Sequence, residues 1–491
     1  MILSTLTRIR QVARNGDTNR AWQMFEEAGL GASQAPDVLA LKGRLLKDRA
    51  LRLEGTDRVE MARQAVEVYR ACAGSRRATY PLINAATIAY LCGDVAEARV
   101  DAARILEIIA SGDHEPETAY WLHATVAEAR LLLGDREGAR AALLAAVEAA
   151  PQAWEDRAAT LRQLREILQV REESVEILAD LSPPSSLHFG GIMDLAGHED
   201  EVLLRLGEVF DEVRPGTVYG ALAAGTDILV AELALQRGAQ LHVVLPGPLE
   251  RFREVSVDAF GSRWGPRFEA LLERAHSFVE FPEHGDVTRA GIVQATQVAM
   301  GLAIRRARQL GSEAVAMHVG RVEEELAPVL ASWKGRGMAL HEIRRDWPPR
   351  GGTEAMAAGY AQAVLACELP FAQEPGNTAE AAQTEDGYWL LRFAEPIAAV
   401  RHACEVLVRQ PDLHFGLDIS VAEHAQPLAN CAERAICFAR SAQRSEICGA
   451  WPHMCVTELL EPYFRFEEAG EVVSPMGDIP IARYTPLQGN R

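Results

Sequence analysis

Tyr219-Gly-Ala-Leu-Ala-Ala-Gly-Thr-Asp227 is the stretch that decides the fold of the middle of this chain. Thr217-Val-Tyr219 has the pattern of a strand, and residues 227–237 have the pattern of a helix. Downstream, Leu241-His-Val-Val-Leu245 is nearly all apolar, which is typical of a strand buried in a parallel sheet. A glycine turn between a strand and a helix, followed by another buried strand, predicts a β-α-β unit.

The alternation of strands and helices continues on both sides of this unit. It begins after Ser182-Pro-Pro-Ser-Ser186, where paired prolines end a helix, and it stops at Pro348-Pro349-Arg-Gly-Gly352. We therefore predict a doubly wound, Rossmann-like α/β domain over residues 186–347. Its other expected elements are strands 187–193, 277–281, 313–319 and 338–344 and helices 199–213, 266–275, 288–310 and 322–333.

The glycine turn is the candidate binding site of this domain. In an open α/β sheet such a turn lies at the carboxyl edge of the strands, where ligands bind, and amides at a helix start hold anions. The stretch matches neither G-x-G-x-x-G nor a Walker loop, and Asp227 places a negative charge in the first turn of the helix. Two interpretations remain open: a ligand pocket, or glycines that only make tight turns.

The segment resembles the Rossmann-like SLOG group, which senses or processes nucleotides and nucleotide-derived ligands. The resemblance rests on this turn, on Gly190-Gly191, on Ala231-Glu-Leu-Ala-Leu-Gln-Arg-Gly238 and on the strand end Leu245-Pro246. It implies a nucleotide-type ligand, or a nucleotide-processing enzyme with Asp227 or Glu232 as the acid or base. The pocket that it implies is lined by Gly190, Gly191, Gly220, Gly225, Thr226, Asp227 and Glu232.

Residues 1–180 carry a repeated turn between helices. Its copies are Gly16-Asp17, Gly93-Asp94 and Gly134-Asp135, each followed by an alanine, with a looser copy at Gly55-Thr-Asp57. The glycine should end one helix in a left-handed cap and the aspartate should cap the next. A period of about forty residues with paired helices predicts an α-solenoid and resembles tetratricopeptide repeats. Such an array binds a protein partner, or it only packs against the rest of the chain.

The tail, residues 360–486, contains Asn430-Cys-Ala-Glu-Arg434, and an Asn and an Arg four apart project from one helix face. With Gly387-Tyr-Trp-Leu-Leu-Arg-Phe393 and His414-Phe-Gly-Leu-Asp-Ile419, it resembles class III nucleotidyl cyclases. The resemblance implies an α+β, ferredoxin-like domain able to form a homodimer. It also implies that Asn430 and Arg434 are catalytic and act on the triphosphate and ribose.

Cyclisation requires two metal ions, Mg²⁺ or Mn²⁺, held by two carboxylates. The resemblance puts Glu368 and Asp386 in these places, and it puts Gln383 where the family has a purine-reading Lys. The interval between the two carboxylates is too short for the family's helical pair. We therefore expect a degenerate cyclase-like domain used for dimerisation or domain contact, with an active adenylate or guanylate cyclase as the alternative.

The order of helical repeats, Rossmann-like domain and cyclase-like tail resembles a bacterial multidomain signalling family. The first two parts are also similar to the TRAFs-binding region of apoptosis signal-regulating kinases. The residues that carry this second resemblance are Ser256-Val-Asp258, Trp264, Arg267-Phe268, Gly301-Leu-Ala303 and Arg306-Ala307.

Composition narrows the function classes further. A formal net charge of −19 argues against nucleic acid as a partner. None of the eight cysteines forms a Cys-x-x-Cys pair, and the sequence shows neither a secretory signal nor a membrane span, so we expect a cytoplasmic protein with free thiols. No Gly-x-Ser-x-Gly or His-Glu-x-x-His motif occurs, and the histidines are scattered. We predict a signalling protein that binds a partner through its repeats and senses a nucleotide-type ligand, with no certain cofactor.

Overall fold

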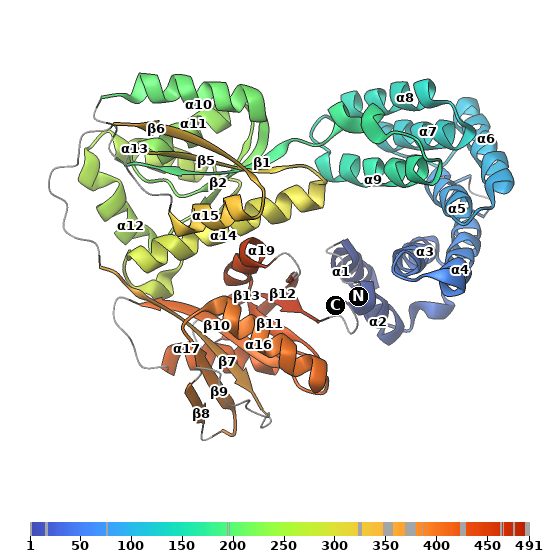
Figure 1. Cartoon of the computed structure of the whole chain (residues 1–491). Helices are drawn as coiled ribbons and strands as arrows, with labels where there is room; N and C mark the ends of the chain where they lie inside the picture. Colours follow the sequence, from blue (N-terminus) through green and yellow to red (C-terminus); the bar gives the residue numbers. More distant parts are fainter. Residues whose placement is uncertain are drawn as a thin grey trace. The chain divides into compact units, whose positions relative to one another are not determined.

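The computed structural model consists of two compact units, Met1–Pro183 and Pro184–Arg491. Figure 1 colours the chain from its N-terminus to its C-terminus. The protein is mixed α/β and mostly helical, with one parallel and one mixed sheet. The structure describes residues 2–14, 18–74, 77–193, 195, 197–322, 327–346, 357–368, 380–384, 386–422, 429–461, 464, 466–474 and 477–486.

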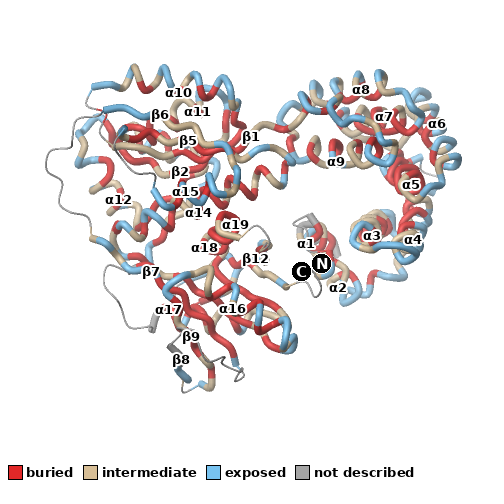
Figure 2. The backbone as a smooth tube through the Cα atoms, in the orientation of Figure 1, coloured by how far each residue is buried: buried red, intermediate tan, exposed pale blue. Residues whose placement is uncertain are grey.

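The first unit is built from helices in its described part, which confirms the helical prediction for the N-terminal region. Most consecutive helices pack against each other, and small residues such as Ala65, Ala85, Ala98 and Ala127 are buried. Figure 2 shows the buried stretches along these helices. The elements are α1 Ile2–Arg14, α2 Thr18–Glu27, η1 Leu30–Ala32, α3 Pro36–Ala50, α4 Gly55–Ala73, α5 Thr79–Leu91, α6 Val95–Ser111, α7 Ala119–Leu133, α8 Arg136–Ala149, α9 Trp154–Val170 and η2 Val175–Leu181.

The repeated turn has the predicted geometry at Gly134-Asp135. Gly134 ends α7 with φ 93° and ψ 5°, and the amide of Gly138 donates to Asp135 Oδ1 at 2.8 Å. Gly93 has the same positive φ between α5 and α6, but Asp94 makes no side-chain hydrogen bond to cap α6, so the predicted cap is absent at this copy. The looser copy differs, because Gly55 is the first residue of α4 instead of the cap of α3. The copy at residues 16–17 lies outside the described residues.

The second unit begins with a six-stranded parallel sheet in the order β4-β3-β2-β1-β5-β6. These parallel pairings confirm the predicted parallel sheet. Helices α10 to α13 pack on one face of the sheet, and α14 and α15 pack on the other (Figure 1). Its elements are β1 Ser185–Gly191, α10 Glu199–Val213, β2 Pro215–Gly220, α11 Thr226–Gln236, β3 Gln240–Val244, α12 Leu249–Ser256, η3 Asp258–Phe260, α13 Trp264–Glu273, β4 Ser277–Val279, η4 Pro282–His284, α14 Arg289–Leu310, β5 Ala314–Arg321, α15 Pro328–Gly335 and β6 Ala339–Arg345.

The second sheet of this unit is mixed, in the order β12-β13-β11-β10-β7-β9-β8, with β10 and β11 parallel and the other described pairs antiparallel. Alternate residues of β7 face opposite ways, so that Leu365 packs with α16 and Val364 packs with α17. Its elements are β7 Tyr360–Cys367, β8 Glu380–Gln383, β9 Trp389–Phe393, α16 Pro396–Arg409, β10 Phe415–Ala422, α17 Ala429–Ser441, β11 Ile447–Ala450, α18 Trp451–Met454, α19 Val456–Leu460, β12 Glu467–Ser474 and β13 Gly477–Tyr484.

The two sheets share one compact unit because α14 packs against α19. Gly301 of α14 lies so close to the backbone carbonyl of Cys455 that a Cβ there would collide with it. Arg308 Nη2 donates to Glu458 Oε1 at 2.9 Å, and buried Arg305 donates to the carbonyl of Phe466 at 2.7 Å. The contact therefore combines close packing with arginine–carboxylate ion pairs.

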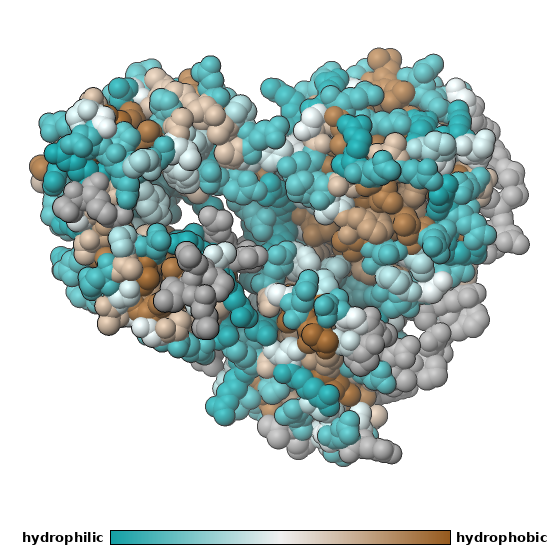
Figure 3. Space-filling view, turned by 180° about the vertical axis from the view of Figure 1, so that it is seen from behind, coloured by the Kyte–Doolittle hydropathy of each residue, from teal (hydrophilic) through white to brown (hydrophobic). Residues whose placement is uncertain are grey.

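On the face shown in Figure 3, hydrophilic side chains predominate, with local apolar areas over both units. Isolated exposed apolar residues are normal on soluble domains. None of the described helices is both long and apolar enough to cross a membrane.

Candidate functional site

Most of the residues predicted at the glycine turn meet at one edge of the parallel sheet. Gly191 ends β1, and a Cβ there would lie 2.8 Å from Thr226 Cγ2. Gly220 ends β2, and Gly225, with φ 86°, precedes α11. The order of strands reverses between β1 and β5, so this edge is also the topological switch point of the sheet. Gly190 lies at the same end of β1, and the role of these residues in ligand binding stays a prediction.

Several amides at this turn, those of Ala223, Ala224 and Thr226, donate to groups of the protein itself. The amide and hydroxyl of Thr226 donate to the carbonyl of Ile192 at 3.1 and 2.9 Å. The amide of Ala223 donates to Asp227 Oδ2 at 3.2 Å. A Cβ on Gly225 would collide with the carbonyl of Met193, so the loop after β1 fits closely over the turn. An anion would have to displace these carbonyl and carboxyl groups to reach the amides.

Asp227 is a buried carboxyl group with an incomplete set of hydrogen bonds. Its Oδ1 has no hydrogen-bond partner. Burial raises the pKa of Asp227 to about 7, although the amide of Ala223 acts in the opposite direction. The carboxyl group can therefore hold or release a proton near neutrality.

Glu232 is not brought together with the glycines. It forms a two-point ion pair with Arg267 of α13, with Nε and Nη2 donating at 2.7 and 2.6 Å. Arg267 in turn lies over the ring of Trp264, with Cζ 4.5 Å from the ring centroid. This pairing joins α11 to α13 on the helical layer, and it uses residues that the sequence placed in separate motifs.

Arg434, predicted to be catalytic, is buried against a partner that the sequence did not reveal. Its Nε and Nη2 donate to Oδ2 of Asp418 on β10 at 3.0 and 2.7 Å. Asp418 is fully buried, and burial raises its pKa to about 6 against the opposing effect of the guanidinium. Asn430 lies in α17, but its side chain lies outside the described part of the structure.

Of the two carboxylates predicted to hold metal, one directly follows a strand and the other lies in a turn. Glu368 comes directly after β7 and accepts a hydrogen bond from Tyr388 Oη at 2.6 Å. Arg440 donates to the same hydroxyl oxygen at 3.3 Å. Asp386 lies in the turn between β8, which ends at Gln383, and β9, and it is exposed. Their role as metal ligands stays a prediction.

A buried polar network joins alternate helices of the first unit. Lys47 Nζ of α3 donates to Asn84 Oδ1 of α5 at 3.3 Å and to Gln163 Oε1 of α9 at 3.0 Å. Gln163 Nε2 and Thr87 Oγ1 both donate to Glu128 Oε1 of α7. Burial raises the pKa of Glu128 to about 7. These residues are far apart in sequence, and no local pattern predicted that they meet.

An aromatic cluster lies beside this network on α4, α5 and α7. Tyr80 packs edge-on against Tyr69 and Trp121, each with 6.4 Å between ring centroids. Tyr120 packs edge-on against Trp121 at 5.4 Å. Tyr69 is buried, whereas Tyr80 is 38% exposed. The cluster therefore has a solvent-facing edge on the helical unit.

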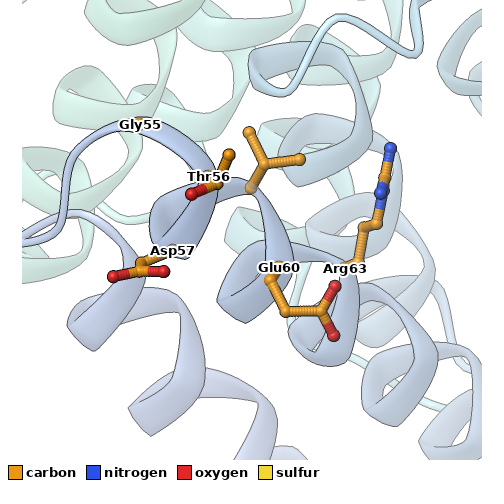
Figure 4. A pocket seen from close by; sticks show the side chains of 6 residues that line it. Gly55, Thr56, Asp57, Glu60 and Arg63 are labelled. Atoms are coloured by element: carbon orange, nitrogen blue, oxygen red, sulfur yellow. The ribbon is translucent and has the colours of Figure 1, made fainter.

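A hollow of about 530 Å³ lies at the start of α4, where Asp57, Glu60 and Arg63 project from successive turns (Figure 4). Gly55, Thr56 and Val59 complete its lining. All of these residues come from one helix, so the hollow gives a ligand little enclosure.

Comparison with known proteins identifies one region. Residues 8–181 match the family model of the MAP3K TRAFs-binding domain. No curated protein matches the chain. A solved structure of a Thermobaculum terrenum O-GlcNAc transferase mutant is 12% identical in sequence, and the alignment covers 71% of this chain and 75% of the transferase chain. Its TM-score of 0.16 is too low to bear on the fold. The helical region of this chain is thus similar to the MAP3K TRAFs-binding domain.

Proposed function

We propose that this protein is a signalling or regulatory protein that binds a protein partner through its helical region, residues 8–181. The observation that carries the proposal is the match of that region to the MAP3K TRAFs-binding domain, a family named for binding other proteins. Arrays of paired helices present extended surfaces to partners, which is consistent with this role.

The aromatic cluster is our candidate for the partner-binding face. Tyrosine, tryptophan and arginine are the residues that most often dominate the energy of protein interfaces. Tyr80 and Trp121 form an edge-to-face pair, and Arg44 and Asp48 of α3 form an ion pair with 3.6 Å between Nε and Oδ2. An apolar, aromatic surface next to a charged pair suits a protein segment with both apolar and polar side chains.

Site-specific photo-crosslinking of the full chain tests the proposal. A photoreactive side chain at Tyr80 should capture a discrete partner in a lysate of the source cells, whereas the same group at exposed Leu144 of α8 should not. The purified partner should then bind the Trp121→Ala variant at least tenfold more weakly, as expected for an interface hot spot. Equal capture from both positions, or equal affinity for the variant, would overturn this assignment.

A second proposal concerns the edge of the parallel sheet, which we propose binds a nucleotide-type ligand. The position of Gly190 and Gly191 at the topological switch point supports it. Gly190 has open space around it, since a Cβ there would have no neighbour closer than 4.0 Å. In a thermal-shift screen, a nucleotide should raise the melting temperature of the wild type but not of Gly190→Val. If no nucleotide in the screen raises the melting temperature of the wild type, the proposal is refuted.

For the mixed sheet we propose a docking or dimerisation role instead of catalysis. The ion pair between Arg434 and buried Asp418 supports this, because a guanidinium that already donates to a carboxylate is less able to bind a triphosphate. The alternative, an active cyclase, is tested by incubating the protein with each nucleoside triphosphate and Mg²⁺ or Mn²⁺ and searching for a cyclic product by mass spectrometry. A product that disappears in Asn430→Ala would replace our proposal with the alternative.

A further inference from the structure

Two histidines that are far apart in the sequence meet inside the second unit. His284 ends η4, just after the parallel sheet's β4, and His453 belongs to α18 in the mixed-sheet part. Their rings stack on Phe281 with centroid separations of 5.0 and 4.9 Å, and the two rings are within 8° of parallel. Both histidines are almost fully buried. The scattered histidines of the sequence thus include a close pair.

The nitrogen atoms of this pair lack the hydrogen bonds that buried polar groups normally make. His284 Nδ1 lies 2.7 Å from the carbonyl oxygen of Pro246, so this nitrogen carries the proton and donates it. Its Nε2 is then an unprotonated acceptor, and it has no hydrogen-bond partner. Neither ring nitrogen of His453 has one. Such groups are rare in folded proteins because each leaves desolvation uncompensated.

A carboxylate completes the group. Glu283 Oε1 lies 3.5 Å from His453 Nε2. One potential ligand atom from each of Glu283, His284 and His453 lies within 4.8 Å of the others. Among the described residues, these three form the cluster whose side chains could hold a metal ion. A zinc ion bonds imidazole nitrogen and carboxylate oxygen at about 2.0 to 2.2 Å, so the three atoms would have to move closer together to share one ion.

We infer that Glu283, His284 and His453 bind one divalent transition-metal ion, best matched by Zn²⁺, with the fourth position left for water. The ligand types are those that zinc prefers, and the hydrogen bond from His284 Nδ1 to a carbonyl is the usual outer-shell support of a zinc-bound imidazole.

The surrounding charges fit a cation at this position. Arg434 Nη1 is 3.9 Å from Glu283 Oε1, beyond hydrogen-bond distance, and its other donors are committed to Asp418. Arg434 is thus shared between two carboxylates, Asp418 and Glu283, whose two negative charges exceed its single positive charge. A bound ion would join η4 of the parallel-sheet part to α18 of the mixed-sheet part and fix their contact.

Metal titration of tag-free, full-length protein tests this inference. After removal of metals with a chelator and dialysis, the wild type should bind about one equivalent of Zn²⁺ by elemental analysis. Co²⁺ should give the visible absorption of a four-coordinate nitrogen and oxygen site. His453→Gln and Glu283→Gln should each weaken binding by at least about tenfold. The matched control is His276→Gln, which changes an exposed histidine of the same unit and should bind as the wild type does.

The outcomes are distinguishable from a loss of folding. Circular dichroism and melting of the metal-free forms report whether each variant is folded. If His453→Gln fails to fold, Glu283→Gln decides the question, because Glu283 is 26% exposed and tolerates substitution more easily. The inference is overturned if the wild type takes up neither ion, or if Glu283→Gln binds Zn²⁺ as tightly as the wild type and His276→Gln.

Discussion

Removal of the Arg434 guanidinium should locally destabilise the mixed sheet. The side chains of Arg434 and Asp418 are 7% and 0% exposed, and Arg434 Nη2 lies 2.7 Å from Asp418 Oδ2. Arg434→Met retains most of the side-chain volume but leaves the carboxyl group buried without its partner. Breaking such a buried pair costs about 3 to 5 kcal/mol, whereas loss of an exposed arginine changes stability by about 0.5 kcal/mol or less.

Hydrogen exchange followed by mass spectrometry measures this effect locally, which suits a chain of more than one unit. A loss of about 3 kcal/mol corresponds to roughly 100-fold faster exchange through local opening in β10 and α17. The matched control is Arg444→Met, because Arg444 pairs with Asp412 at 3.3 Å with both side chains 81% exposed. Exchange in that variant should match the wild type.

The double variant Arg434→Met with Asp418→Leu separates a lost ion pair from lost packing. Replacing both members of a buried pair by apolar residues is often neutral or stabilising, so most of the protection should return. If Arg434→Met exchanges in β10 as slowly as the wild type, the guanidinium does not hold Asp418, and its assignment as a structural residue is wrong.

Three further predictions concern other buried groups. The folded-state pKa of Asp227 is about 7, against an ordinary value of 3.8, so between these values the native state binds a proton that the unfolded state does not. The free energy of unfolding should therefore fall as pH rises from about 4 to 7. Measured as urea midpoints over a pH series, this fall should be smaller in Asp227→Asn. Gly301→Ala should lower the melting temperature because its Cβ meets the Cys455 carbonyl, whereas Gly207→Ala, with open space around it, should not. Glu128→Gln should melt near the wild type at pH 7, whereas Glu128→Leu, which leaves its donors unpaired, should melt lower by calorimetry.

Local patterns made the elements of the parallel sheet predictable. Helix α10 begins and ends at the expected residues, and the strands around Thr217 and Leu241 lie close to their predicted places. Helix α12 was missed because its eight residues are mostly polar or charged and carry too short an apolar period. The glycine turn was also placed at the correct edge, because parallel strands direct their carboxyl ends to one side.

The partners of the candidate site residues could not be predicted in the same way. Asp418 stands in a strand sixteen positions before Arg434, and no local pattern states that their side chains meet inside. Likewise Glu283 and His453 are brought together only when α18 docks beside η4. Contacts of this kind depend on tertiary packing, for which one sequence carries no periodic signal.

The contact between the two sheets bears on what the tail does. Glu458 of α19 is buried, and its carboxylate accepts a hydrogen bond from Arg308 of α14. The guanidinium of Arg336 donates to the backbone carbonyls of Glu458 and Leu459. Arginines of the parallel-sheet part thus bind α19 at several points, and removal of one would leave a buried carboxylate unpaired. Such anchoring supports our proposal that the tail has a docking role instead of a catalytic one, because several arginines hold it against the parallel-sheet part.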